Sequence, residues 1–190
     1  MPEAQRRIGF DEYLALERAG DVRHEYVRGE LFAMVGASRA HNRIVTRLVV
    51  ALHTRLAGRG CEVYSNDMRV RVEATDFVAY PDVVVACGEP SFHDALFDTL
   101  LDPVLVVEVL SASTADHDRG SKFAHYRAIP SLRDYLLVAQ DEVRVEHFAA
   151  EADGTWRFSE TRDPAAAIEL PAVGCSLPVA EVYEGLFEGL

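Results

Sequence analysis

Two strongly apolar runs, each interrupted by one acidic residue, constrain the fold of this chain more than any other feature. One run, Val83-Val84-Val85, directly follows Asp82, and the other, residues 104–110, is apolar except for Glu108. Continuous β-branched runs are typical of central strands that are covered on both faces. Buried carboxylates are usually ion-paired, hydrogen-bonded or bound to metal, because burying one without a partner is costly. A structural salt bridge to arginine could explain either acid alone, but two acids on strands expected to be adjacent favour metal binding.

The surrounding pattern predicts an α/β (α+β) fold in which a mixed sheet is flanked by helices. Helical apolar spacing and cap residues indicate the helices, whereas alternating or continuous apolar runs indicate the strands. The expected elements are a helix over 10–19, a hairpin over 25–35 that turns near Gly29, a helix from the cap Ser38 to about 57, strands over 62–72, 77–87 and 104–110, a helix over about 116–129 capped by Ser113 or Thr114, a strand over 135–139, a hairpin over 143–148 and 155–159, and a short helix near 179–187. The central order is therefore helix, three strands, helix, strand.

The length of 190 residues suits a single domain, 1–190, with a core over about 36–140 and a C-terminal hairpin and tail over 141–190. No apolar stretch reaches the roughly 18 residues that span a bilayer, and no signal-peptide core follows the polar N-terminus, so we expect a cytoplasmic protein. The three cysteines are odd in number and have no zinc-binding spacing. They are therefore predicted to be reduced thiols.

The net charge of −12 argues against nucleic-acid binding by the chain as a whole, because phosphate neutralisation needs lysine and arginine. The charge is uneven, however: residues 39–71 contain seven arginines and two acidic residues. Arg39, Arg43 and Arg47 recur every four residues, so they form a stripe on the predicted helix that could lie along a phosphate backbone. An ordinary solvated helix face is the alternative.

The chain contains eighteen arginines but a single lysine, Lys122. An arginine stays protonated, whereas a lysine ammonium is a compact charge whose pKa can be shifted, so the lone lysine marks a candidate catalytic position. Chance survival of a surface lysine is the alternative. Lys122 is one helical turn from both Asp118 and Tyr126, which places the three on one face of the predicted helix.

The order Pro81-Asp82, then Glu108 on the next strand, resembles the PD-(D/E)XK nuclease signature. The wider pattern is similar to the bacterial "putative restriction endonuclease" domain family of that superfamily, and the matching stretches span most of residues 10–150. These stretches are 24–30, 37–41, 80–85, 106–114, 118–126 and 134–138. One departure is that the lysine of the general superfamily pattern would fall at Leu110. The subfamily instead supplies its lysine from the following helix, where Lys122 lies.

This resemblance implies a restriction-endonuclease-like core and a Mg²⁺- or Mn²⁺-dependent endonuclease that hydrolyses phosphodiester bonds in DNA, as a homodimer. Asp82 and Glu108 would hold the metal with the backbone carbonyl of Val109, and Lys122 would position the attacking water and stabilise charge on phosphorus.

His41, Glu25 and Glu30 also match the family and are candidates for supporting the metal site. Each has a structural alternative, the start of a helix for His41 and orientation of the hairpin for the glutamates. The net acidity and the displaced lysine keep a second function open, a degenerate nuclease fold that acts as a binding or regulatory module. A nuclease-like structural partner of another protein is a third interpretation.

Overall fold

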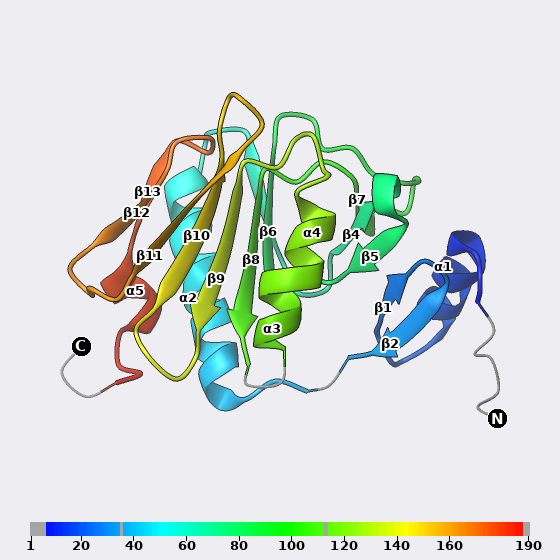
Figure 1. Ribbon diagram of the computed structural model, residues 1–190, viewed down its shortest axis with the longest axis horizontal. Helices are drawn as coiled ribbons and strands as arrows, with labels where there is room; N and C mark the ends of the chain where they lie inside the picture. The colour runs from blue at the N-terminus through cyan, green and yellow to red at the C-terminus, as the bar shows by residue number, and fades with distance from the viewer. Residues whose placement is uncertain (1–6, 35, 112–113, 188–190) are drawn as a thin grey trace.

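The computed structural model describes residues 7–34, 36–111 and 114–187, and it arranges them around two larger mixed β-sheets and one small one (Figure 1). The six-stranded sheet has the order β11-β10-β9-β8-β6-β3, and the five-stranded sheet has the order β2-β1-β5-β4-β7. In the part of the chain that the structure describes, only β8–β9 and β4–β7 are parallel pairs. The bounds of the six-stranded sheet are β3 Cys61–Ser65, β6 Val83–Cys87, β8 Leu105–Leu110, β9 Asp134–Ala139, β10 Val145–Ala150 and β11 Trp156–Thr161.

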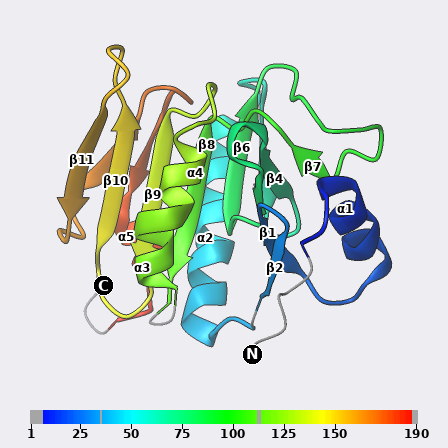
Figure 2. The same ribbon diagram turned by 45° about the vertical axis from the view of Figure 1, so that its right-hand side comes forward.

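The five-stranded sheet lies beside the larger one and carries the N-terminal hairpin (Figures 1 and 2). Its strands are β1 His24–Val27, β2 Glu30–Ala33, β4 Arg69–Val72, β5 Phe77–Ala79 and β7 Thr99–Leu100. The helices are α1 Phe10–Ala19, α2 Arg39–Leu56, α3 Ala115–His117, α4 Phe123–Tyr126 and α5 Val179–Tyr183, and a π-helical turn at Asp118–Lys122 joins α3 to α4.

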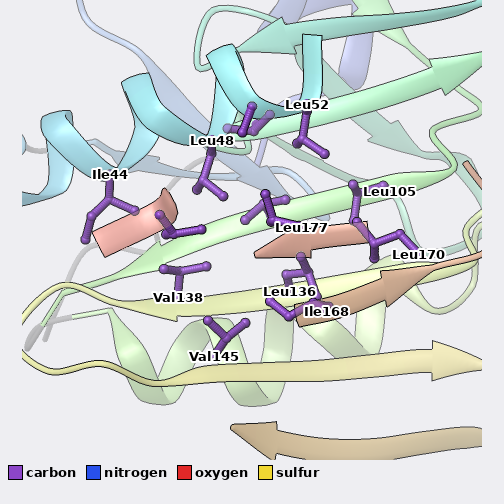
Figure 3. Close-up of a cluster of buried hydrophobic side chains, with 14 of the residues drawn as sticks. Ile44, Leu48, Leu52, Leu105, Leu136, Val138, Val145, Ile168, Leu170 and Leu177 are labelled. Carbon is purple, nitrogen blue, oxygen red and sulfur yellow. The ribbon is translucent and has the colours of Figure 1, made fainter. Parts of the chain in front are cut away.

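Helices cover both faces of the six-stranded sheet, as the alternation of its apolar residues requires. On one face, α2 packs with α5 and the hairpin β12 (Ala167–Leu170)–β13 (Cys175–Pro178). Figure 3 shows this core, in which Leu48 and Leu52 of α2 lie over Leu105 and Leu136. On the other face, α4 and the five-stranded sheet form a second core around Tyr126. The predicted mixed sheet flanked by helices is confirmed.

Several predicted elements are confirmed in detail. The N-terminal helix spans Phe10–Ala19, and Ser38 caps α2 by accepting a hydrogen bond from the backbone N–H of His41 at 3.0 Å. The hairpin turns at Arg28-Gly29, where both residues have positive φ (49° and 93°), as a two-residue hairpin turn of this twist needs. Gly29 is required there for a second reason, because a Cβ would lie 2.8 Å from that of Arg7.

Two predicted strands are wrong, because each divides between the two larger sheets. The run 62–72 becomes β3 and β4, separated by a turn in which the N–H of Met68 donates to the carbonyl of Ser65. The run 77–87 becomes β5 and β6, separated at Pro81, which has no N–H to donate to a strand ladder. The chain therefore passes from the five-stranded to the six-stranded sheet immediately before Asp82.

The remaining differences lie at element ends and in the tail. The predicted helix over 116–129 is divided by its π-helical turn and ends earlier, at Tyr126. Thr114 occupies the N-cap of α3 without a side-chain cap, while Val35 and Ser113 lie outside the described residues. The short strand β7 and the hairpin β12–β13 were not predicted. In the described part of the chain, no helix has the length and apolarity to cross a membrane.

The prediction of three reduced thiols is wrong, because the structure joins Cys61 and Cys87 in a disulfide. The two residues are cross-strand partners in the antiparallel pair β3–β6, with their Cα atoms 4.0 Å apart. This register is a tertiary feature that cysteine spacing does not reveal. Cys175 remains a free thiol.

We expect the disulfide to stabilise the fold, because it constrains the unfolded chain across a separation of 26 residues. Reduction, or the paired substitution Cys61→Ser with Cys87→Ser, should lower the free energy of unfolding by about 2–4 kcal/mol in urea titrations. Cys175→Ser is the matched control. Three titratable thiols in the unfolded, unreduced protein would contradict the pairing.

Candidate active site

The two acidic residues that interrupt the apolar runs lie side by side. Strands β6 and β8 pair antiparallel with Val83 opposite Val107, so Asp82 lies opposite Glu108 and both side chains project from the face that α3 and α4 cover. Asp82 Oδ2 accepts a hydrogen bond from the N–H of Val109 at 2.7 Å. Among the described residues, neither carboxylate is paired with an arginine.

Lys122 lies next to Glu108, at the centre of a buried ionic cluster. Its Nζ is 3.3 Å from Glu108 Oε1, 2.7 Å from Glu25 Oε1 and 3.0 Å from Asp118 Oδ1. The contact with Asp118 is an ion pair without hydrogen-bond alignment. Lys122 is 5% exposed and Glu108 is 4% exposed, so water screens these charges little.

This cluster holds more negative than positive charge, and the proton affinities of its members reflect that imbalance. Burial raises the pKa of Glu108 well above its usual range, Lys122 opposes the rise, and the nearby carboxylates of Asp118, Asp82 and Glu25 add to it. Burial alone would lower the pKa of Lys122, but the surrounding carboxylates raise it, so the ammonium stays protonated. Four carboxylates and one ammonium leave an excess of negative charge that a divalent cation would neutralise.

A tyrosine and a histidine orient the two glutamates of the cluster. The hydroxyl of Tyr126 donates to Glu108 Oε1 at 3.1 Å, so that oxygen contacts both Lys122 and Tyr126. The described residues place no hydrogen-bond partner on Glu108 Oε2. Glu25 Oε2 lies 3.0 Å from His117 Nε2, and the other ring nitrogen of His117 lies 2.5 Å from Ser121 Oγ.

Helix α1 holds strand β1, and with it Glu25, against the cluster. Glu17 accepts hydrogen bonds from the N–H of His24 at 2.6 Å and from the Tyr80 hydroxyl at 3.1 Å. The Tyr13 hydroxyl donates to the carbonyl of His24 at 3.0 Å. These contacts fix the residue immediately before Glu25, so the position of the hairpin determines the position of that carboxylate.

The cluster lines a cavity of about 750 Å³ between the hairpin, the start of α2, and the ends of β6 and β8. Asp82, Glu108, Lys122 and Val109 line it, as does His41, whose Nε2 is 3.1 Å from Asp82 Oδ2. The cavity therefore gathers all three predicted catalytic residues and one predicted supporting residue.

The hairpin contributes Glu25 to this cavity rather than the predicted supporter Glu30. Glu30 forms an exposed ion pair with Arg7 at 2.9 Å and does not line the cavity. The matching family stretch contains both glutamates, which share one face of the hairpin, and they differ in that Glu30 lies next to the turn whereas Glu25 lies near the other end of β1. Sequence analysis also missed the cavity-lining residues Phe32, Tyr80 and Gln140.

The arginine stripe on α2 largely faces the C-terminal helix. Arg47 pairs with Glu184 at 2.8 Å and Arg55 with Glu181 at 2.6 Å, while Arg43 lies against the segment around Gly185. Of the three predicted phosphate-binding arginines, only Arg39 is exposed on the first turn of α2. Arg47 of the predicted stripe is thus ion-paired within the chain, whereas phosphate binding by Arg39 and Arg43 stays a prediction.

The side chains present fit a magnesium ion that keeps much of its own water. No group of three or more histidine, cysteine or acidic side chains in the described residues is arranged to hold a metal. Asp82 and Glu108 nevertheless offer adjacent hard oxygen donors in an anionic cavity that Val109 also lines. Mg²⁺ commonly binds through one or two carboxylates, with water and substrate oxygens completing its octahedron.

We expect Lys122→Met to destabilise the fold by about 3–5 kcal/mol at pH 7, because it leaves three buried carboxylates without their cation. The loss should shrink as the pH falls, because burial raises the pKa of Glu108, and without the ammonium that carboxyl would bind a proton more readily in the folded than in the unfolded protein. Chemical denaturation at pH 7 and pH 5 measures both effects. Arg162→Met, in an exposed ion pair, is the control and should leave the free energy of unfolding close to that of the wild type. A loss that does not depend on pH would contradict this account of the cluster.

Comparison with known proteins agrees with this geometry. A family model named Uma2, described as "Putative restriction endonuclease", matches residues 10–180. The uncharacterized protein sll1609 of Synechocystis sp. is 37% identical over 158 residues, which are 83% of this chain and 89% of that protein. The uncharacterized protein slr1290 of the same organism is 36% identical over 180 residues, which are 95% of this chain and 93% of that protein.

A solved structure has the same fold. It is the crystal structure of a "putative nuclease belonging to DUF820" from Anabaena variabilis, with a TM-score of 0.76 over 95% of this chain and 99% of that one. Its sequence identity of 17% makes this a likeness of fold alone. The family match covers nearly the whole chain and includes every residue of the ionic cluster. The chain belongs to the Uma2 family of restriction-endonuclease-like proteins.

Proposed function

We propose that this protein is a metal-dependent endonuclease that hydrolyses phosphodiester bonds in DNA at the cavity lined by Asp82, Glu108 and Lys122. The observation that supports it best is the convergence of the only lysine of the chain on a carboxylate pair that projects from adjacent strands. A purely structural ion pair would need one acid, whereas the Lys122 ammonium contacts three carboxylates, and Asp82 lines the same cavity.

In this proposal, Asp82 and Glu108 would hold Mg²⁺ or Mn²⁺, and the ion would supply Lewis-acid chemistry to the phosphate and to an attacking water. The N–H of Val109 and the ring of His41 both contact Asp82 Oδ2 and so fix the orientation of that carboxylate. Tyr126 and Lys122 occupy one oxygen of Glu108 and leave the other available to the metal. The Lys122 ammonium positions the water and stabilises the negative charge that develops on the phosphoryl oxygens.

The DNA substrate and a homodimer are further parts of the proposal that come from the family resemblance, and the cytoplasmic location is the one expected from the sequence. Two copies would bring two sites to one duplex and allow a cut in each strand. The second candidate function is a degenerate nuclease fold that binds partners without catalysis, and the net charge of −12 favours it. Metal-dependent cleavage distinguishes the two functions directly.

We expect the wild-type protein to nick plasmid DNA with Mg²⁺ or Mn²⁺ and to be inactive with excess chelator. Asp82→Asn and Glu108→Gln should abolish cleavage, because each removes a charged metal ligand while keeping the side-chain shape. Lys122→Ala should lower the rate by about 10²–10³-fold if the ammonium stabilises the transition state.

The matched control is Glu160→Gln, which removes an exposed carboxylate on β11 that pairs with Arg162. It should cleave at the wild-type rate. Equal background nicking by the wild type and all three site variants would overturn the nuclease proposal. Calorimetry with Mn²⁺ then tests the rival function. A binding module does not need the metal, so its Mn²⁺ affinity should not depend on the Asp82 carboxylate and should be the same in Asp82→Asn.

Tyr126→Phe should weaken Mn²⁺ binding by about 10–100-fold, because it deletes the hydroxyl that orients Glu108 while leaving the buried ring in place. Titration calorimetry of the folded variant measures the change in dissociation constant. Tyr183→Phe is the control, since its hydroxyl donates to the carbonyl of Arg144 on the opposite face of the sheet. Equal metal affinity in wild type and Tyr126→Phe would show that Tyr126 does not position the ligand.

A further inference from the structure

Phe32 is a large apolar side chain that stands half exposed beside the ionic cluster. It is 50% exposed and lines the cavity from strand β2. In the hairpin register Phe32 is the direct partner of Glu25, so both side chains lie on one face with Cβ atoms about 5 Å apart. Glu25 in turn contacts the Lys122 ammonium at 2.7 Å. An aromatic ring is thus held next to the carboxylate that binds the proposed catalytic lysine.

The cavity has both apolar and acidic lining residues. Phe32, Val22 and Met34 are apolar lining residues from the hairpin side, where the charged Asp21, Arg23 and Glu25 also line the cavity, and Val22 is 55% exposed. Asp82 and Glu108 lie on the sheet side. A nucleotide has the same division, because its base is flat and apolar on its faces whereas its phosphate would need the metal that the sheet side is proposed to hold.

The charge of the cavity argues against recognition through many phosphates. Its described lining has only Lys122 and Arg23 as lysine or arginine side chains, against five carboxylates. Lys122 is already surrounded by carboxylates, and Arg23 pairs with Asp67. With little phosphate neutralisation, affinity for a nucleic acid must come from contacts with its bases. Base–aromatic stacking is a strong contact with a base.

We propose that Phe32 is a stacking platform for one unpaired base next to the scissile phosphate, so that the substrate strand must be single or locally unpaired where it is cut. In a duplex both faces of a base are covered by its neighbours, and a base must leave the stack to meet a protein ring. Phe32 is thereby a specificity-determining residue, outside the group that carries out hydrolysis. This inference rests on the proposed nuclease function and adds the class of substrate.

The test measures binding separately from cleavage. A fluorescein-labelled single-stranded DNA oligonucleotide and the matching duplex are titrated with full-length protein by fluorescence anisotropy, with Ca²⁺ replacing Mg²⁺. The wild type should bind the single strand more tightly than the duplex. Phe32→Ala should weaken single-strand binding by about 5- to 150-fold, and Phe32→Trp should retain it. Phe158→Ala is the control, because Phe158 is 54% exposed on β11, is not part of the cavity lining, and should bind like the wild type.

Abasic substitutions locate the stacked base. Moving one abasic site along the oligonucleotide should weaken wild-type binding at one position and leave Phe32→Ala unaffected there, since the ring and the base act as a pair. Three results would each overturn the stacking proposal. They are a Phe32→Ala variant that binds the single strand as tightly as the wild type does, a Phe32→Ala variant that loses the same affinity for intact and for abasic strands, and a wild type that binds the duplex more tightly than the single strand.

The outcome also separates this inference from the nuclease function. Metal-dependent cleavage that Phe32→Ala performs equally on single and double strands would overturn the stacking platform and leave the nuclease intact. If the wild type binds single strands through Phe32 but does not cleave them, the nuclease proposal is overturned and the base-binding site remains.

Discussion

The structure of the site depends on one buried ammonium group, that of Lys122. It contacts carboxylates from three separate parts of the chain: Glu25 on β1, Glu108 on β8 and Asp118 in the π-helical turn. Because a buried charge is tolerated only when it is well paired, the hairpin, the sheet and the helix must all be docked for this cluster to exist. The site therefore has its geometry only when these three elements are packed together.

The passage of the chain from the five-stranded to the six-stranded sheet positions Asp82 beside that cluster. Pro81 ends β5 in the five-stranded sheet, and Asp82 begins the approach to β6 in the six-stranded one. The antiparallel register of β6 and β8 then places Asp82 opposite Glu108. The cavity thus lies where the two sheets meet, which is where residues from distant stretches of sequence can converge.

Sequence periodicity was sufficient for the strands over 104–110 and 135–139 and for the helices α1 and α2, because their apolar patterns are strong and local. It did not reveal that the runs 62–72 and 77–87 each divide between the two larger sheets. The family motif was sufficient to select Asp82, Glu108 and Lys122, which the structure brings together. It could not decide between Glu25 and Glu30, because that choice depends on how the hairpin pairs with β5. The Cys61–Cys87 disulfide and the ion pair between Arg47 and Glu184 likewise depend on contacts between segments far apart in sequence.

The pairing of Glu25 with Phe32 across the hairpin has a consequence for the length of its turn. Successive side chains on a strand alternate between faces, so inserting one residue at the Arg28-Gly29 turn would shift the register and turn one of the two away from the cavity. An insertion at this turn is therefore compatible with both side chains in the cavity only if the added residue is taken up in a longer loop that leaves the strand register unchanged.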